Sequence, residues 1–214
     1  MSTGIFWLCV IAAALPAMAQ ERRADLPVAL YTSFEQQLPA AVLGALHNEL
    51  ENLMEPEGLH LDWRSLAGVS GADVAAELAV VKFQGRCDAD GLVMRSVHPG
   101  ALGWTHVSDG VILPFADVDC DRIRVFLQKE LMFLRATDRA EAYGRAVARV
   151  VAHELYHIFT QTAHHAAEGI GKSAFSVQDL LSGDFAFDER ESEMLRGVAV
   201  RVSPPAERTD AMMQ

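Results

Sequence analysis

The residues His153-Glu154-Leu155-Tyr156-His157 place two imidazoles and one carboxylate at a spacing that suits metal chemistry. On an α-helix, residues four positions apart lie on one face about one turn apart, so His153 and His157 can direct ring nitrogens at one metal ion. Glu154 lies one step around the helix, where its carboxylate can reach a metal-activated water rather than the metal itself. These residues predict a catalytic zinc site, with the two histidines as ligands and Glu154 as the general base.

The segment around this motif has the pattern of a long helix. Residues 140–162 contain no proline, their only glycine is Gly144, and apolar residues recur at helical spacing. Asp138, followed three residues later by Glu141, predicts a capping box at the start of the helix. We therefore expect a helix over residues 138–162 that carries the motif near its end.

A catalytic zinc usually has three protein ligands and one open position, so a third ligand is needed. His164 and His165 follow the motif closely. In a straight helix His164 would lie about 10 Å beyond His157 along the axis, whereas a zinc–nitrogen bond is about 2.0 Å long. The chain must therefore leave the helix soon after Thr160 and fold back, which the weak helix formers at residues 160–162 allow.

An HExxH motif with another histidine close behind it resembles the zincin metallopeptidases, and within them the metzincins. Their pattern would place a glycine at Thr160 and the third histidine at Ala163, and this sequence departs from it at both positions. Met194 is a candidate for the methionine turn of that family. The resemblance implies a zincin-like fold, a bound Zn²⁺ and peptidase activity.

A longer stretch, HELYHIFTQTAHHAAEGIGKSAFSVQDLL, is similar to a group of uncharacterised exported bacterial proteins. Their shared pattern has a histidine, a Gly-x-x-Lys sequence and an aromatic residue after HELYH. The matching residues here are His165, Gly169, Lys172 and Phe175. This resemblance favours His165 over His164 as the third ligand.

A downstream carboxylate is the other option for the third ligand, as in zincins that use a glutamate from a second helix. The available residues are Glu168, Glu189, Glu191 and Glu193. Acidic residues at the start of a helix also complement the helix dipole, so a solvated helix start is the more usual interpretation of the last three.

The first nineteen residues have the features of a signal peptide. A short apolar run over residues 5–15 precedes Ala17-Met18-Ala19, which has small residues at both positions that signal peptidase inspects. We expect cleavage before Gln20 and a secreted or periplasmic protein. The run is too short to remain as a membrane-spanning helix, so no stable membrane anchor is expected after cleavage.

Cysteine usage and charge fit this expectation. Without residues 1–19 only Cys87 and Cys120 remain, and an even count in an oxidising compartment predicts one disulfide. The chain carries 29 acidic against 18 basic residues, for a net charge of -11. This acidity argues against nucleic acid and anionic membranes as partners, and it leaves the oligomeric state open.

The remaining pattern predicts an α/β fold of the zincin-like α+β kind, with one domain over residues 20–202 and a flexible tail over 203–214. We expect a mixed twisted sheet packed on the active-site helix and a small helical C-terminal subdomain. The predicted strands are 28–32, 59–63, 79–83, 102–107 and 111–115. The predicted helices are 40–54, 121–134, 138–162, 177–181 and 189–200.

The function that these features predict is a secreted zinc-dependent metallopeptidase that hydrolyses peptide bonds of a peptide or protein substrate with Glu154 as general base. A substrate strand could lie along residues 102–107 or 111–113. Within the first of these, Trp104 and His106 could face the cleft, but a single aromatic residue or histidine in a strand more often belongs to the core or the surface, so no specificity residue is assigned. The alternatives are an exported zinc-binding protein without catalytic activity and a zinc hydrolase of non-peptide substrates.

Overall fold

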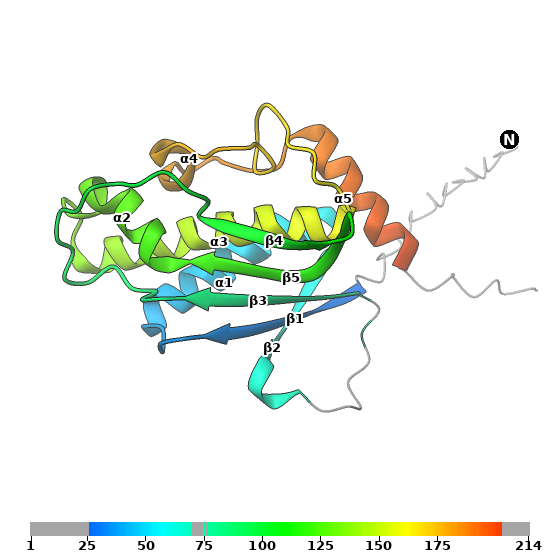
Figure 1. The fold of residues 1–214 in the computed structure, drawn as a ribbon, viewed down its shortest axis with the longest axis horizontal. Coiled ribbons are helices and arrows are strands. Elements are labelled where there is room, and N and C mark those ends of the chain that lie inside the picture. Colours follow the sequence, from blue (N-terminus) through cyan, green and yellow to red (C-terminus); the bar gives the residue numbers. More distant parts are fainter. Residues whose placement is uncertain (1–25, 70–74, 76, 203–214) are drawn as a thin grey trace, which may run out of the picture.

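A five-stranded sheet with strand order β2-β1-β3-β5-β4 forms one layer of the molecule (Figure 1). The computed structural model describes residues 26–69, 75 and 77–202, so the predicted signal peptide and C-terminal tail lie outside the described residues. The strands are β1 (Leu26–Phe34), β2 (Leu59–Ser65), β3 (Glu77–Gln84), β4 (Gly103–Ser108) and β5 (Val111–Asp119). Only β4 runs antiparallel to its neighbour, β5, which confirms the predicted mixed sheet.

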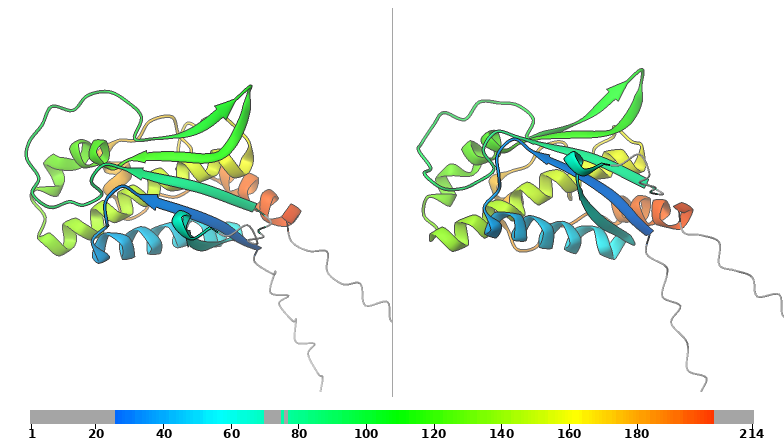
Figure 2. Two further views of the ribbon diagram at one scale, coloured as in Figure 1. Left: turned by 60° about the horizontal axis from the view of Figure 1, so that its bottom comes forward. Right: turned by 90° about the horizontal axis from the view of Figure 1, so that it is seen from below.

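The helices are α1 (Ala40–Met54), α2 (Cys120–Leu131), α3 (Ala136–Thr160), α4 (Val177–Leu181) and α5 (Glu189–Val202), with short 3-10 turns η1 (Glu55–Glu57) and η2 (Leu66–Gly68). Figure 2 shows α1 and α3 side by side beneath one face of the sheet. The part of the chain that the structure describes contains no helix that could span a membrane.

Helix α3 lies at the centre of the hydrophobic core, and all of its residues from Ala146 to Phe159 are buried. It contacts the sheet, α1 and the C-terminal helices, whose Leu180 and Leu195 belong to the same core. Gly144 permits the close packing of α1 on α3, because a Cβ at this position would lie 2.5 Å from the carbonyl oxygen of Val42 and 2.7 Å from Ala45 Cβ.

The start of α3 differs from the prediction. The helix begins at Ala136 rather than Asp138, and its N-cap residue, Arg135, makes no side-chain cap hydrogen bond. Asp138 instead lies in the first turn and accepts a 2.8 Å hydrogen bond from Arg135 Nε. The capping box predicted from Asp138 and Glu141 is therefore wrong, because the helix extends one turn further toward its N-terminus than that box would allow.

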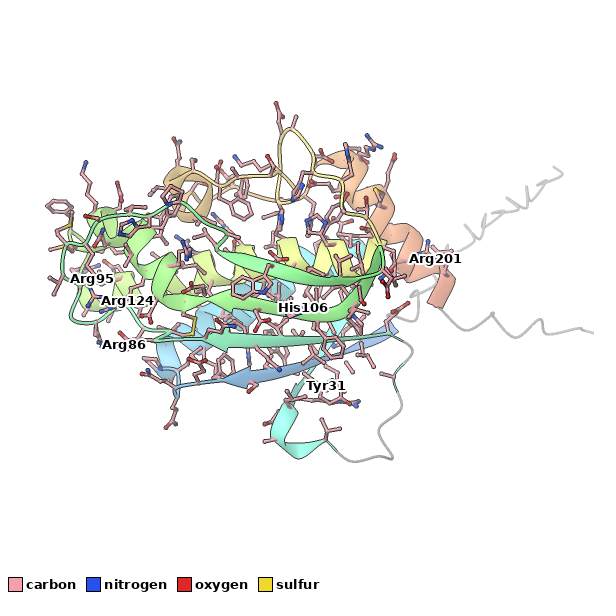
Figure 3. All side chains as sticks on the ribbon, viewed as in Figure 1. Tyr31, Arg86, Arg95, His106, Arg124 and Arg201 are labelled. Carbon is pink, nitrogen blue, oxygen red and sulfur yellow. A yellow bond between two sulfur atoms is a disulfide. The ribbon has the colours of Figure 1, made fainter. Side chains whose placement is uncertain are left out.

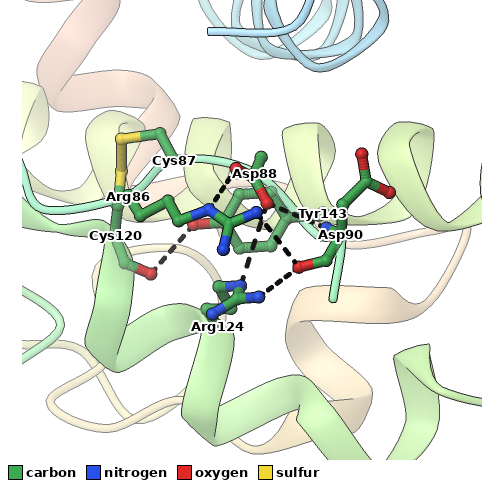
Figure 4. A network of polar contacts seen from close by, with 7 residues as sticks. All are labelled: Arg86, Cys87, Asp88, Asp90, Cys120, Arg124 and Tyr143. Carbon is green, nitrogen blue, oxygen red and sulfur yellow. Dashed lines mark hydrogen bonds and ion pairs between the residues drawn. A yellow bond between two sulfur atoms is a disulfide. The ribbon is translucent and has the colours of Figure 1, made fainter. Parts of the chain in front are cut away.

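The predicted disulfide between Cys87 and Cys120 is present, with 4.8 Å between the two Cα atoms. It attaches the segment 85–102, which follows β3, to the first residue of α2. Tyr143 of α3 donates a 2.9 Å hydrogen bond to the carbonyl of Cys120. A polar network surrounds the bond (Figure 4), formed by Arg86, Asp88, Asp90 and Arg124.

Candidate metal centre

The last two turns of α3 and the segment after it bring three imidazoles together. Ring nitrogens of His153, His157 and His165 all lie within 4.8 Å of one another. The chain can return toward the helix because α3 ends at Thr160 and Gln161 adopts a left-handed conformation with φ 53°. Within the described residues, these three histidines are the only group of metal-ligating side chains with such spacing.

Two backbone carbonyls fix the orientation of the helical histidines. The Nδ1 atom of His153 lies 2.7 Å from the carbonyl oxygen of Ile170, and that of His157 lies 2.6 Å from the carbonyl oxygen of Thr162. Because a carbonyl can only accept, both rings must donate from Nδ1. Each Nε2 is then left unprotonated in the neutral ring and available as a metal ligand.

The relation between these two Nε2 atoms fits a bound cation. They lie 3.0 Å apart, although neither has a proton to donate in the neutral tautomers. Burial lowers the pKa of His153 to about 4 and also lowers that of His157, so protonation of either ring is disfavoured at neutral pH. A Zn²⁺ ion held by the three imidazoles would remove the repulsion between the facing lone pairs.

The other candidate ligands lie outside this group. His164 and His165 are both exposed, but only His165 has a ring nitrogen within the group, while the backbone N–H of His164 donates a 3.1 Å hydrogen bond to Thr162 Oγ1. Glu191 is only 1% exposed and packs elsewhere, while the remaining acidic candidates are exposed: Glu168, Glu189 and Glu193. The geometry thus favours His165 over these residues, and the binding of metal itself stays a prediction.

Glu154 is buried beside the histidines and is held by strand β4. Thr105 donates a 2.7 Å hydrogen bond from its hydroxyl to Glu154 Oε2. Burial raises the pKa of Glu154 to about 7, and the hydrogen bonds from Thr105 partly oppose this rise. The sequence did not single out Thr105, although its place in a predicted strand of alternating faces was a usable signal.

Two cavities meet at the histidines and Glu154. The larger one, of about 480 Å³, is bounded by residues 97–103 on one side and by Lys172 and Phe175 on the other. The smaller one, of about 240 Å³, lies along β4 and β5 beside Trp104, Val107 and Ile112. The site is therefore the middle of an open groove rather than a closed internal site.

Two of the residues matched by the GxxK resemblance, Lys172 and Phe175, lie at this groove. Lys172 lines the larger cavity and forms a 2.5 Å ion pair with Asp179 of α4. The ring of Phe175 packs edge-on against His153, with 5.4 Å between ring centroids. Both side chains thus border the histidine group from the segment between α3 and α4.

The other three residues that the sequence suggested for the site are His106, Trp104 and Met194. His106, labelled in Figure 3, pairs with Asp117 on the sheet and lines neither cavity. Trp104 borders the smaller cavity. Met194 lies beside Tyr156, whose hydroxyl donates a 3.5 Å hydrogen bond to the Met194 sulfur.

The comparisons with known proteins found similarity in structure but none in sequence. No protein-family model and no curated protein matches the sequence. The fold is similar to the crystal structure of archaemetzincin from Methanopyrus kandleri, with a TM-score of 0.49 and 15% sequence identity over 83% of this chain and 97% of that chain. A likeness at this level transfers no function, so a function can be assigned only from the residues of the site itself.

Proposed function

We propose that this protein is a secreted zinc-dependent metallopeptidase. The observation that carries the proposal is the convergence of three imidazoles on one point beside a buried carboxylate, Glu154, at an open groove. A site that only stabilised the fold would have no use for an acid at this position. Three protein ligands also leave zinc an open position for water or substrate.

His153, His157 and His165 would hold the metal. When bound there, Zn²⁺ supplies Lewis-acid polarisation of the scissile carbonyl and lowers the pKa of a water molecule. The carbonyls of Ile170 and Thr162 keep two of the three rings in the tautomer that this task needs.

Glu154 is placed to move protons during hydrolysis. Its Oε2 atom is occupied by the Thr105 hydroxyl, which leaves Oε1 free to accept a proton from water and to return it to the leaving amine. In the metal-free protein burial raises the pKa of Glu154 to about 7, so this carboxyl can both take and give a proton near neutral pH.

Strand β4 provides a surface for an extended substrate. It forms one edge of the sheet and pairs only with β5 among the described strands. A peptide added along this edge would pass Glu154, because Thr105 of β4 contacts that carboxylate. Peptide or protein substrates fit this arrangement better than compact small molecules. Export of the enzyme is consistent with the disulfide between Cys87 and Cys120.

The first test compares wild type with Glu154→Gln in zinc content and in cleavage of casein and a peptide library. We expect zinc to be retained and turnover to fall by at least about 100-fold, because the amide cannot accept the proton. Glu141→Gln, an exposed position on the same helix, is the matched control. A wild type that binds zinc and cleaves no peptide would support the zinc-binding protein, or a hydrolase of other substrates, instead.

A second test concerns the third ligand. His165→Ala should lose the metal during dialysis, since two imidazoles remain, whereas His164→Ala should keep it. Metal analysis of the folded variants is the measurement. Retention of zinc by His165→Ala together with its loss from His164→Ala would reverse the assignment.

A further inference from the structure

Glu191, near the start of α5, is a buried carboxylate outside the histidine group. Its Oε2 atom accepts a 2.8 Å hydrogen bond from the backbone N–H of Asp188, and its own N–H donates a 2.8 Å hydrogen bond to Asp188 Oδ1. This reciprocal pair caps the helix. Its Oε1 atom is buried and makes no hydrogen bond of ordinary geometry with the described residues, although it faces the Gly171 backbone, so capping does not account for the whole side chain.

Both oxygens of this carboxylate lie against a short glycine segment. A Cβ on Gly169 would lie 2.6 Å from Glu191 Oε2, and a Cβ on Gly171 would lie 2.1 Å from Glu191 Oε1 and 3.2 Å from Tyr156 Cε1. Gly169 also has φ +73°, a conformation that side chains disfavour. The carboxylate thus fills the space that side chains at both positions would occupy.

Ile170, between the two glycines, links this contact to the histidine group. Its side chain is fully buried and its N–H donates a 3.1 Å hydrogen bond to the carbonyl of Ala186. Its own carbonyl accepts the hydrogen bond from His153 Nδ1. The direction of that carbonyl decides which nitrogen of His153 is protonated and where the ring points.

We propose that Glu191 is a positioning residue: by supporting Gly169 and Gly171 it holds the Ile170 carbonyl toward His153 and so sets the orientation of this imidazole for metal binding. The inference rests on the proposed function in taking His153 as a ligand. It assigns to Glu191 a role that is neither ligation nor capping alone.

The test measures zinc affinity by competition with a chelator, and the His153 ring by nitrogen-15 NMR of the metal-free protein. We expect Glu191→Ala to weaken zinc binding by about 10-fold to 100-fold, as removal of an outer partner of a metal ligand does. The Nδ1–H signal of His153 should weaken or shift in the same variant. Glu191→Gln, which keeps the volume of the side chain, should restore both to within about threefold of wild type.

Two controls separate positioning from capping. Glu193→Ala changes an exposed residue of the same helix and should leave zinc affinity unaltered. Asp188→Ala removes one half of the cap and leaves the Glu191 carboxylate against the glycines, so it should affect stability more than zinc affinity. If Glu191→Ala does not fold, Gly171→Ala provides the same comparison, because its methyl group must displace Glu191 Oε1.

The proposal is overturned if a folded Glu191→Ala binds zinc as wild type does with an unchanged His153 signal, or if Asp188→Ala weakens zinc binding equally. Neither the zinc-affinity measurement nor the NMR measurement depends on peptide cleavage. A protein that binds zinc without cleaving peptides would therefore contradict the proposed function alone, and the NMR signature of the metal-free protein decides the role of Glu191 even if wild type binds no zinc.

Discussion

Thr105 distinguishes the two oxygens of Glu154. By donating to Oε2 it orients the carboxylate in the groove and leaves the other oxygen for the proton transfer that we propose. Neighbouring groups also orient the histidines, because the carbonyls of Ile170 and Thr162 accept hydrogen bonds from Nδ1 and so select the tautomer. At this scale the proposed chemistry would depend on neighbours that orient Glu154 and the histidines as much as on these groups themselves.

Removal of the Thr105 hydroxyl should therefore lower turnover without loss of metal. For Thr105→Val we expect kcat to fall about 10-fold while zinc content and KM change little, because the base is misoriented but the ligands are intact. Steady-state kinetics with metal analysis measures both. Thr137→Val, at an exposed threonine in the first turn of α3, is the control. Loss of zinc from Thr105→Val would show that the hydroxyl supports the metal site rather than the base.

Helix α3 both carries two of the histidines and packs against α1 in the core. Its last turns carry the histidines, while its first half packs so closely on α1 that only Gly144 fits beside the carbonyl of Val42. The histidines can be positioned only if this packing holds the helix in place. At its other end the helix must stop at Thr160, because a continued helix would carry His165 away from the group.

Gly144→Ala tests the packing of α1 on α3. The added methyl group would lie 2.5 Å from a backbone oxygen, which cannot move without moving α1. We expect the free energy of unfolding to fall by about 1–3 kcal/mol in urea titration. Gly44→Ala is the control, since its Cβ would meet nothing within 4 Å in the middle of α1, and there alanine should stabilise the fold by up to about 1 kcal/mol. A Gly144→Ala variant as stable as wild type would contradict the close packing.

The start of α5 should make stability depend on pH. Burial raises the pKa of Glu191 to about 7, above the value of 4.5 for a free side chain, so the folded state holds a proton that the unfolded state releases. The free energy of unfolding is therefore higher at low pH, where the buried carboxyl is protonated, and it falls as the pH rises from about 4.5 to about 7.

Chemical denaturation of the metal-free protein at pH 5 and pH 8 measures this effect. Wild type should lose about 2 kcal/mol more than Glu191→Gln between these values. The pKa of Glu154 is also raised to about 7, but this residue is present in both proteins. Its contribution to the pH dependence of stability is therefore the same in both and does not affect the difference between them. Equal pH dependence of the two proteins would mean that Glu191 stays charged in the folded state.

For the whole molecule, the disulfide connects the sheet, α2 and the wall of the groove. The segment that begins at Cys87 continues to residues 97–102, which bound the larger cavity. The histidines, by contrast, belong to α3 and the segment after it. Stability and the shape of this wall should therefore be separable from metal binding.

Replacement of both cysteines by serine should lower the free energy of unfolding by about 3–4 kcal/mol, the value that chain entropy gives for a loop of this length. Zinc content should remain the same while KM rises, because the groove wall is less restrained. Denaturation with and without reductant measures the first effect, and reductant should change wild type only. Loss of zinc from the serine variant would show that the two regions are coupled.

The sequence by itself determined the features that depend on local pattern. Periodicity placed α1, α3 and the five strands to within a few residues, and it put His153, Glu154 and His157 on the last turns of one helix. The even cysteine count identified the disulfide. These predictions succeed because helix geometry and strand alternation repeat over neighbouring residues. The prediction of where α3 starts was wrong, because Asp138 forms a local salt bridge with Arg135 instead of capping the helix.

Only the tertiary structure brings His165, and not His164, beside the two histidines of the helix. From the residues alone the choice between His164 and His165 stayed open, since it depends on the turn at Gln161 and on how the returning segment packs. The roles of Thr105 and Glu191 depend on contacts with residues of other elements, a helix in one case and a glycine segment in the other. No repeating pattern in the sequence predicts such contacts, because they arise when the packing of whole elements brings distant residues together.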